Sequence, residues 1–378
     1  MLLHGIFPPL TTPFYPDGRV YLKKLEHNVE HYSKTPISGL VLLGSTGEAI
    51  MLSDEERREV LKTARSACAP HKVLIAGTGA ESAVETLRLT EYAAELGYDV
   101  ALVRTPHFYR PQMEPANLLA FYRTVADRSP IPIMIYSVPV FTKYDMPPEL
   151  VIQLAEHPNI IGIKESGGDA EKIRQMVEAT RHIKRTATVT ETFAAVTPRM
   201  ATPNGSEEGG ELLPVAALAG VRTEGSGTSF RRTGVDGRSH TDMATTSRAS
   251  SSSVTLIGNL KTRQKEVGFQ VLAGTAHKFL PSLEAGAVGG VLAFATPAPT
   301  ACYEIYTAWK EGDQELARIK QERITGASMR VGSQLGIPGL KYALDLNGYY
   351  GGPARLPFLP LTAEAKAEVG RLMADVRN

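Results

Sequence analysis

The stretch "NIIGIKESGGD", residues 159–169, decides the fold because it joins a short apolar run to the start of a helix. The run is rich in β-branched side chains and is closed by serine and glycine, as a buried parallel strand is. The residues that follow, "DAEKIRQMVEATR" (169–181), favour a helix. A strand followed directly by a helix predicts one βα unit of a parallel sheet.

The same unit repeats along the chain. Helices are expected between the strands: Ser53 and Glu56 have the spacing of a capping box, and Pro147 and Pro148 suit a first helical turn. Eight strands before residue 297 predict a closed (β/α)₈ barrel, the TIM barrel, rather than an open sheet. The seven other apolar runs are "GIFPPLTTPF", "GLVLLGS", "KVLIAGTG", "DVALVRTP", "PIMIYSVP", "FQVLAGTA" and "GGVLAFAT".

An insertion interrupts the repeat. We expect the barrel to comprise residues 1–181 and 267–296, with a C-terminal helical region over residues 297–378. Residues 182–266 lie between the sixth helix and the seventh strand, and much of this segment is rich in Ser, Thr, Gly and Arg, which is typical of a flexible chain. Within it, "FAAVTPRMA" and "ELLPVAALAGV" could form short packed pieces. Because the insertion precedes a strand, it is expected at the end of the barrel away from the catalytic face.

Composition narrows the class of protein. The 41 basic and 40 acidic side chains give a net charge of +1, which offers no electrostatic argument for nucleic acid or a membrane surface. Two cysteines far apart suit a reducing cytoplasm and argue against a disulfide scaffold and a cysteine-ligated metal. No apolar stretch approaches the roughly 20 residues that span a bilayer. Prolines interrupt the N-terminal apolar run before a signal-peptide core, so we expect a soluble, cytoplasmic protein.

Lys164 is the first candidate for chemistry. It directly follows the apolar residues 160–163, on the strand face that it shares with Gly162 and Ser166. Burial at the upper end of a barrel would lower the pKa of its ammonium group, and a neutral amine attacks a ketone to form a Schiff base. The alternative is a lysine that extends from the strand end into solvent.

Tyr136 stands near the end of the preceding strand, so the two side chains are expected on neighbouring strands at the catalytic face. A phenol beside a Schiff-base lysine can transfer protons during catalysis, whereas the alternative is a core tyrosine with a satisfied hydroxyl. The second strand ends in "GSTGE", where the hydroxyls of Ser45 and Thr46 and consecutive N–H groups beside Gly47 suit a small carboxylate. Such a loop is also often only a turn. Together these groups are what a 2-oxo acid aldolase needs.

At these residues the sequence resembles the dihydrodipicolinate synthase and N-acetylneuraminate lyase superfamily of Schiff-base aldolases. The resemblance rests on "TTPF", "GSTGE", "YSVP" and "GIKES" and covers the chain apart from the insertion. It implies pyruvate or a pyruvate-derived substrate with an aldehyde, no cofactor and no metal, and a homotetramer built from tight dimers. It implies Lys164 as the Schiff-base lysine, Tyr136 as the acid/base, and Ser45, Thr46 and Gly47 as carboxylate binders. Gly274, which closes "FQVLAG", is placed in the same substrate site.

Two positions depart from the synthases of this superfamily. Where those enzymes carry a tyrosine that enters a neighbouring subunit's proton relay, this chain has Phe108, with Tyr109 next to it as a possible replacement. Where they use an arginine to bind the carboxylate of the second substrate, this chain has Phe141, with Lys143 nearby. An apolar side chain there argues against aspartate semialdehyde as the partner.

Other segments resemble the 4-hydroxy-2-oxoglutarate aldolases of the superfamily, among them "HPNIIGIKESGGD", "GAVGGV", "IPGLK" and "GYYGGPARLP". This branch implies reversible cleavage of 4-hydroxy-2-oxoglutarate to pyruvate and glyoxylate, and we prefer it. The alternatives are a dihydrodipicolinate synthase, which condenses pyruvate with aspartate semialdehyde, a sugar-acid lyase, and a catalytically silent homologue that binds a 2-oxo acid. Glu48 is expected to orient its loop through hydrogen bonds, and "GYYGGPARLP" to close the C-terminal helices against the barrel.

Overall fold

The computed structural model describes residues 1–190, 192, 194–201, 255–257 and 260–376. Eight parallel strands form one sheet in the order β1-β11-β10-β6-β5-β4-β3-β2. A bridge between Pro9 and Val41 joins the segment after β1 to β2, so the sheet closes into a barrel. The predicted (β/α)₈ barrel is therefore confirmed. Its strands are β1 (Gly5–Ile6), β2 (Gly39–Leu42), β3 (Val73–Gly77), β4 (Val100–Arg104), β5 (Ile133–Ser137), β6 (Ile160–Glu165), β10 (Gln270–Ala273) and β11 (Gly289–Gly290).

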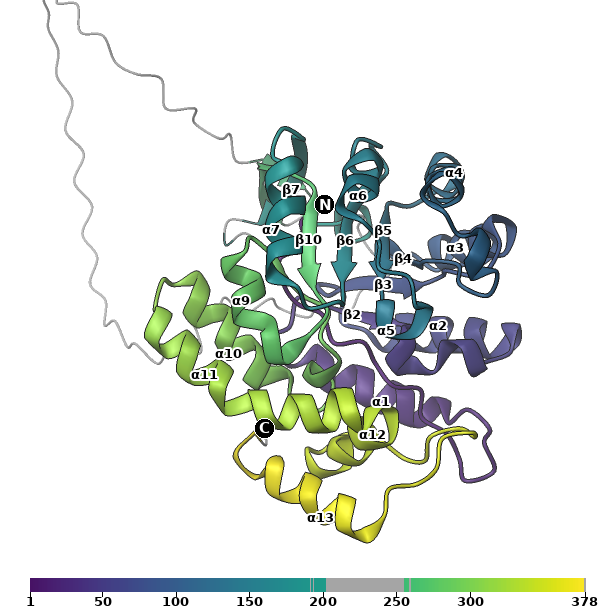
Figure 1. Cartoon of the computed structure of the whole chain (residues 1–378), viewed down its shortest axis with the longest axis vertical. Helices are drawn as coiled ribbons and strands as arrows, with labels where there is room; N and C mark the ends of the chain where they lie inside the picture. The colour runs from purple at the N-terminus through teal and green to yellow at the C-terminus, as the bar shows by residue number, and fades with distance from the viewer. Residues whose placement is uncertain (191, 193, 202–254, 258–259, 377–378) are drawn as a thin grey trace, which may run out of the picture.

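Helices surround the barrel, as Figure 1 shows. Helix α2 begins with the predicted capping box, because the Ser53 hydroxyl accepts the Glu56 N–H and the Glu56 carboxylate accepts the Ser53 N–H. Pro148 is the first residue of α6, where a missing N–H costs nothing. Outside the insertion, the helices that lie between consecutive strands of the barrel are α1 (Leu22–Ser33), α2 (Asp54–Ala67), α3 (Ala83–Glu95), α4 (Pro115–Arg128), α5 (Pro139–Thr142), α6 (Pro148–Ala155), α7 (Ala170–Ala179) and α9 (Phe279–Glu284).

The C-terminal helical region begins with a helix (residues 299–310) that packs against β1 and continues to the carboxyl ends of the strands, toward which the arrowheads in Figure 1 point. Residues 328–334 continue α11 as a π-helix before α12, and such a widened turn is frequent at functional sites. The helices of this region are α10 (Pro299–Lys310), α11 (Gln314–Ala327), α12 (Gly336–Leu346) and α13 (Ala363–Leu372).

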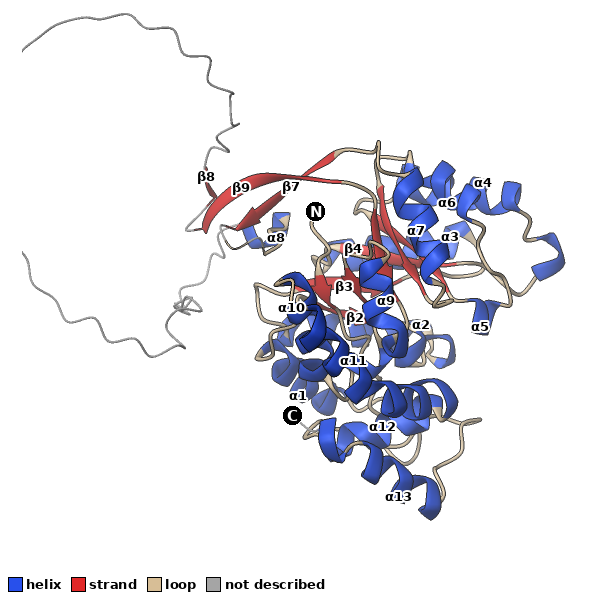
Figure 2. Cartoon of the chain, turned by 60° about the vertical axis from the view of Figure 1, so that its left-hand side comes forward, coloured by secondary structure: helices blue, strands red, loops and turns tan. Residues whose placement is uncertain are grey.

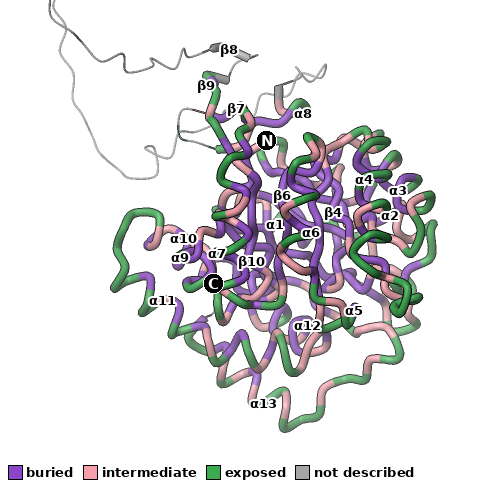
Figure 3. The backbone as a smooth tube through the Cα atoms, turned by 45° about the horizontal axis from the view of Figure 1, so that its top comes forward, coloured by how far each residue is buried: buried purple, intermediate pink, exposed green. Residues whose placement is uncertain are grey.

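The core has two layers. Alternate strand residues fill the inside of the barrel with branched apolar side chains, such as Val41, Ile75 and Leu102. The other strand face packs against the surrounding helices, so the buried segments in Figure 3 run through the middle of the molecule. Within the part of the chain that is described, no helix is both long and apolar enough to cross a membrane.

The two ends of the insertion form an antiparallel ribbon, a structure that the sequence pattern does not predict. Strand β7 (Arg185–Thr190) pairs with β9 (Leu260–Val267), which also pairs with β8 (Thr255–Ile257). Figure 2 shows the ribbon extending from the barrel. The short helix α8 (Pro198–Ala201) ends the segment "FAAVTPRMA", whereas "ELLPVAALAGV" lies outside the described residues.

The ribbon and α8 lie at the amino ends of the barrel strands, where the insertion is expected. Ala187 and Val189 of β7 pack against Leu2, just before β1. The Arg199 guanidinium of α8 donates to the carbonyls of Pro70 and Lys72, and it forms a 2.9 Å ion pair with Asp99. These partners immediately precede β3 and β4. The insertion therefore covers the end of the barrel opposite to the C-terminal helices.

Candidate active site

Lys164 and Tyr136 lie side by side at the carboxyl ends of β6 and β5. The two residues are register partners in the parallel pairing of these strands. The Lys164 Nζ lies 4.0 Å from the centroid of the Tyr136 ring. Lys164 is only 4 % exposed, so its amine is largely removed from water. An amine held against a phenol is the pair that Schiff-base chemistry with proton transfer requires.

The "GSTGE" loop reaches the same point from β2. Ser45–Gly47 forms one 3₁₀ turn directly after the strand. The Ser45 Oγ lies 3.2 Å from the Tyr136 hydroxyl, and Thr46 is buried beside it. The carbonyl of Gly47 accepts a 2.7 Å hydrogen bond from the Thr12 hydroxyl. The loop is therefore fixed on both sides of the hydroxyls that the sequence predicts as carboxylate binders.

A chamber of about 360 Å³ opens over these residues. Gly274 forms part of its wall, and a side chain there is impossible because a Cβ would lie 2.0 Å from the Ser166 Oγ. The π-helix contributes Ser328 and Ser333. The other polar lining residues are Ser45, Thr46, Tyr136, Lys164, Ser166, Thr275 and His277, and the larger apolar ones are Val138, Val140, Phe141, Phe294, Ile337, Leu340 and Phe358.

The chamber carries little formal charge. Burial lowers the pKa of His277 below its usual value of 6.5, and the nearby Lys278 lowers it further, so its imidazole is neutral at pH 7. Among the residues that line the chamber, Lys164 is the only lysine, arginine, aspartate or glutamate. The chamber therefore offers a ligand mainly hydroxyl and backbone groups and the Lys164 amine.

Glu165 anchors the end of β6 from the other strand face. Its side chain is fully buried, and one oxygen lies 3.2 Å from the Lys172 Nζ of α7. Burial raises the pKa of Glu165, although Lys172 and the Gly167 N–H partly oppose the shift. Its backbone carbonyl accepts a 2.7 Å hydrogen bond from the Gly274 N–H. These contacts hold Lys164 and the chamber wall at Gly274 in one rigid unit.

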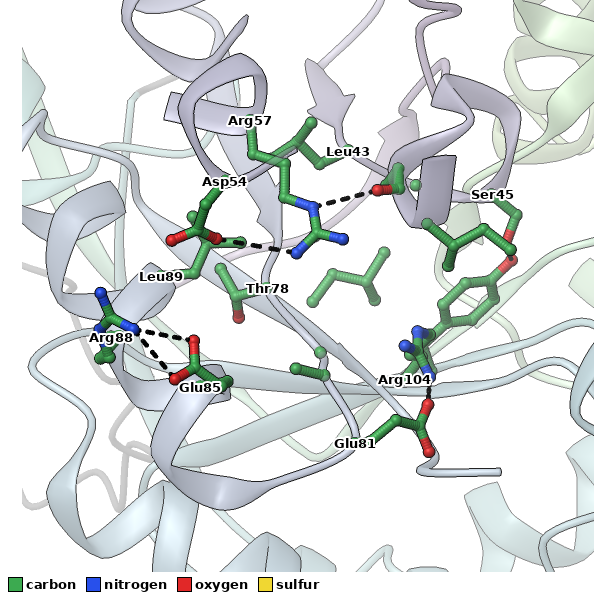
Figure 4. A pocket seen from close by; sticks show the side chains of 18 of the residues that line it. Leu43, Ser45, Asp54, Arg57, Thr78, Glu81, Glu85, Arg88, Leu89 and Arg104 are labelled. Carbon is green, nitrogen blue, oxygen red and sulfur yellow. Dashed lines mark hydrogen bonds and ion pairs between the residues drawn. The ribbon is translucent and has the colours of Figure 1, made fainter. Parts of the chain in front are cut away.

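A second cavity of about 200 Å³ is shown in Figure 4, and it shares Tyr136 and Ser45 with the chamber as lining residues. Its ion pairs join Arg104 to Glu81 at 2.7 Å, Arg88 to Glu85 at 3.0 Å and Arg57 to Asp54 at 3.9 Å. The chamber and this charged side cavity therefore meet at Ser45 and Tyr136.

Two aromatic positions have different surroundings. Phe141 lies in the wall of the chamber, whereas Lys143 does not line it. Phe108 and Tyr109 are 75 % and 66 % exposed and contact each other edge to face, outside the residues that line the chamber. The possible relay role of Tyr109 requires a neighbouring subunit and stays a prediction.

Sequence reasoning assigned no role to Lys341 and Arg355, which the structure brings to the "GSTGE" loop. The Lys341 Nζ lies 2.7 Å from a carboxylate oxygen of Glu48, and the Arg355 N–H donates to the other oxygen. The available signal was the lysine in "IPGLK", because it stands in an apolar stretch just as Lys164 does.

A (β/α)₈ barrel with an amine, a phenol and a hydroxyl loop at the carboxyl ends of its strands defines a class of aldolase-type enzymes. The family model described as "Dihydrodipicolinate synthetase family" matches residues 2–189 and 247–376. The chain belongs to this family, which confirms the expectation of an enzyme of the lysine Schiff-base lyase class. The gap between the matched ranges falls inside the insertion.

Two relatives illustrate the similarity in sequence. A 4-hydroxy-tetrahydrodipicolinate synthase of Methanothrix thermoacetophila is 28% identical over 377 residues, which is 100% of this chain and 98% of the relative. One of Xanthomonas axonopodis pv. citri is 41% identical over 177 residues, 47% of this chain and 58% of the relative.

Solved structures show the same fold. The chloride-inhibited dihydrodipicolinate synthase of Acinetobacter baumannii complexed with pyruvate has a TM-score of 0.72 at 23% identity, covering 100% of this chain and 99% of that chain. YagE of Escherichia coli K12, solved in complex with pyruvate, has a TM-score of 0.72 at 22% identity, with the same coverage.

Proposed function

We propose that this chain is a lyase that forms a Schiff base between Lys164 and pyruvate or a larger 2-oxo acid. The observation that carries the proposal is the buried Lys164 amine, 4.0 Å from the Tyr136 ring and facing the chamber beside Ser45. The Lys164 amine attacks the ketone carbon, the carbinolamine hydroxyl takes a proton from the Tyr136 hydroxyl and leaves as water, and an iminium forms. The iminium accepts the electron pair when the C–C bond breaks.

Each neighbouring group has a defined task in this scheme. Ser45, Thr46 and the backbone at Gly47 bind the carboxylate next to the reacting ketone. After Tyr136 has given its proton to the departing carbinolamine hydroxyl, the resulting phenolate takes the proton from the substrate hydroxyl as the aldehyde departs, and the adjacent Ser45 hydroxyl orients it. The remaining enamine is protonated at carbon and hydrolysed, which releases pyruvate and regenerates Lys164. Condensation is the same sequence in reverse.

Two aldehydes are candidates for the reaction partner of pyruvate. Cleavage of 4-hydroxy-2-oxoglutarate to pyruvate and glyoxylate is supported by Phe141, which puts an apolar wall where a cation would bind the second substrate of a synthase. Condensation of pyruvate with aspartate semialdehyde is supported by the names of relatives 28% to 41% identical in sequence. The second reading has the stronger support from the comparisons, and the first from the site.

Borohydride reduction in the presence of pyruvate, followed by peptide mass mapping, tests the class of reaction. A reduced pyruvyl adduct on Lys164 is expected, and its absence from folded protein at neutral pH contradicts the proposal. Steady-state assays with 4-hydroxy-2-oxoglutarate, with pyruvate plus aspartate semialdehyde, and with 2-oxo-3-deoxy sugar acids then identify the aldehyde.

A homo-oligomer belongs to the same proposal. The exposed pair Phe108 and Tyr109 gives the surface near the side cavity an apolar character that a second copy of the chain would cover. Analytical ultracentrifugation tests it, because a monomer at assay concentration would contradict it. The cytoplasmic location likewise stays a prediction.

A further inference from the structure

A buried ion pair lies directly behind the loop proposed to bind the substrate carboxylate. The Lys341 Nζ of α12 is 2.7 Å from a carboxylate oxygen of Glu48, the residue after the Ser45–Gly47 turn. The two side chains are 1 % and 0 % exposed. Neither residue lines the chamber. Their charges therefore act on the protein itself rather than on a substrate.

Lys341 connects three separate segments. Besides contacting Glu48, its ammonium group donates to the carbonyl of Thr12 and to the carbonyl of Pro353, each at 2.8 Å. The Thr12 hydroxyl in turn donates to the carbonyl of Gly47. One buried cation thus holds the carboxylate loop, the segment after β1 and the C-terminal segment in a fixed arrangement.

The backbone of Glu48 shows why the loop needs such a restraint. Glu48 has φ 54° and ψ 30°, in the left-handed region that glycine adopts more cheaply than other residues. Its second carboxylate oxygen accepts the Arg355 N–H at 2.8 Å. The Arg355 guanidinium is itself held by both oxygens of Glu56, at 2.8 and 2.6 Å. The side-chain contacts of Glu48 with Lys341 and Arg355 therefore stabilise the strained conformation of the loop.

A contribution to folding stability does not by itself explain the buried Glu48–Lys341 ion pair. Taking two charges out of water costs several kcal/mol each, and well-packed apolar replacements of buried pairs are often neutral or stabilising. A buried pair does fix geometry, because each charge requires the other in place. A displacement of about 1 Å at a binding group lowers catalysis by roughly 100-fold.

We propose that Glu48 and Lys341 are positioning residues that set the carboxylate-binding loop, so that α12 of the C-terminal region determines the affinity of the barrel for the 2-oxo acid. This inference rests on the proposed function of Lys164 and the loop. It assigns a task to the lysine of the "IPGLK" segment.

The test uses the full chain and measures how much pyruvate is needed to trap the adduct on Lys164. Glu48→Gln and Lys341→Met are each expected to raise the half-saturating pyruvate concentration by about 10- to 100-fold, with trapping still reached at saturation. Glu48→Gly relieves the backbone strain but is expected to show the same rise. Wild-type affinity in Glu48→Gly would show that the backbone alone sets the loop, which would overturn the proposal.

A double variant separates positioning from stability. Glu48→Gln combined with Lys341→Met leaves no unpaired buried charge, so its melting temperature is expected to recover toward wild type while the raised pyruvate requirement persists. Recovery of both together would overturn the proposal. Asp99→Asn is the matched control, because it breaks a buried ion pair at the opposite end of the barrel. It is expected to lower the melting temperature with unchanged pyruvate dependence.

The outcomes also distinguish this inference from the proposed function. If the unaltered chain forms no adduct, both proposals are overturned. If it forms the adduct and the single variants need no more pyruvate than the unaltered chain, only the positioning role is overturned.

Discussion

The two ends of the barrel contain similar buried charged side chains in different surroundings. Each end has a buried lysine and a buried ion pair: Lys164 with Glu48–Lys341 at the carboxyl end, and Lys72 with Asp99–Arg199 at the amino end. At the carboxyl end these groups surround or support a chamber. At the amino end, Lys72 and Arg199 donate hydrogen bonds to backbone carbonyl groups, and Arg199 belongs to α8, which packs over this end. A buried charge therefore indicates a site only where a cavity reaches it.

Replacing the two buried lysines in parallel gives the largest expected contrast. Lys164→Met removes the proposed nucleophile, so we expect kcat to fall at least about 1000-fold and the borohydride adduct to disappear. Lys72→Met leaves the carbonyls of Thr35 and Ile37 without their donor and should cost about 1–3 kcal/mol of stability. Adduct formation in Lys72→Met should equal wild type. An adduct that survives in Lys164→Met would contradict the assignment.

The hydroxyl of Tyr136 is expected to have the next largest effect. Tyr136→Phe keeps the ring against Lys164 but removes the acid/base group, so kcat should fall by about 10²- to 10⁴-fold. Tyr98→Phe is the control, because that hydroxyl donates to the carbonyl of Leu61, away from the chamber. Steady-state kinetics of both variants checks this. A similar small loss in the two would mean that Tyr136 is only a packing residue.

Deletions within the insertion test whether the amino end affects catalysis. Replacing residues 202–254 by a short glycine–serine linker should leave adduct formation unchanged, because the proposed site residues lie elsewhere. Removing residues 186–264 also deletes Val189 and Arg199 and leaves the Asp99 carboxylate without its ion-pair partner. This should lower the free energy of unfolding by about 3 kcal/mol or more. We expect activity to survive below the lowered melting temperature. Lost activity in a chain that remains folded and assembled would contradict this.

The smallest expected effect is a pH dependence at the amino end. Burial lowers the pKa of His4 from 6.5 to about 4, and Lys265 and Lys310 contribute. The unfolded chain therefore binds a proton as the pH falls below 6.5, whereas folded His4 resists it until about pH 4. Stability from this group is complete above pH 6.5 and is lost toward pH 4, by up to about 3 kcal/mol. Denaturant unfolding of His4→Gln should show a weaker pH dependence across this window, while equal slopes would refute it.

The barrel was predictable from sequence because each βα unit is a local pattern, and parallel pairing then places Tyr136 beside Lys164. The β7–β9 ribbon was not, since its buried apolar contacts are few, chiefly Ala187, Val189 and Val267. The contribution of Lys341 was also missed, because it meets Glu48 only after the chain has returned across the barrel. Spacing within a motif carries no information about such long-range partners.

The distance along the chain between Glu48 and Lys341 has a consequence for biosynthesis. The "GSTGE" loop is translated early, but its buried carboxylate has no counter-charge until α12 has been made. A chain that stops after β11 contains every strand of the barrel and the proposed Lys164 nucleophile, yet it leaves Glu48 unpaired. If the pair has the positioning role proposed above, incomplete chains with a nearly whole barrel would bind the 2-oxo acid more weakly than the finished chain.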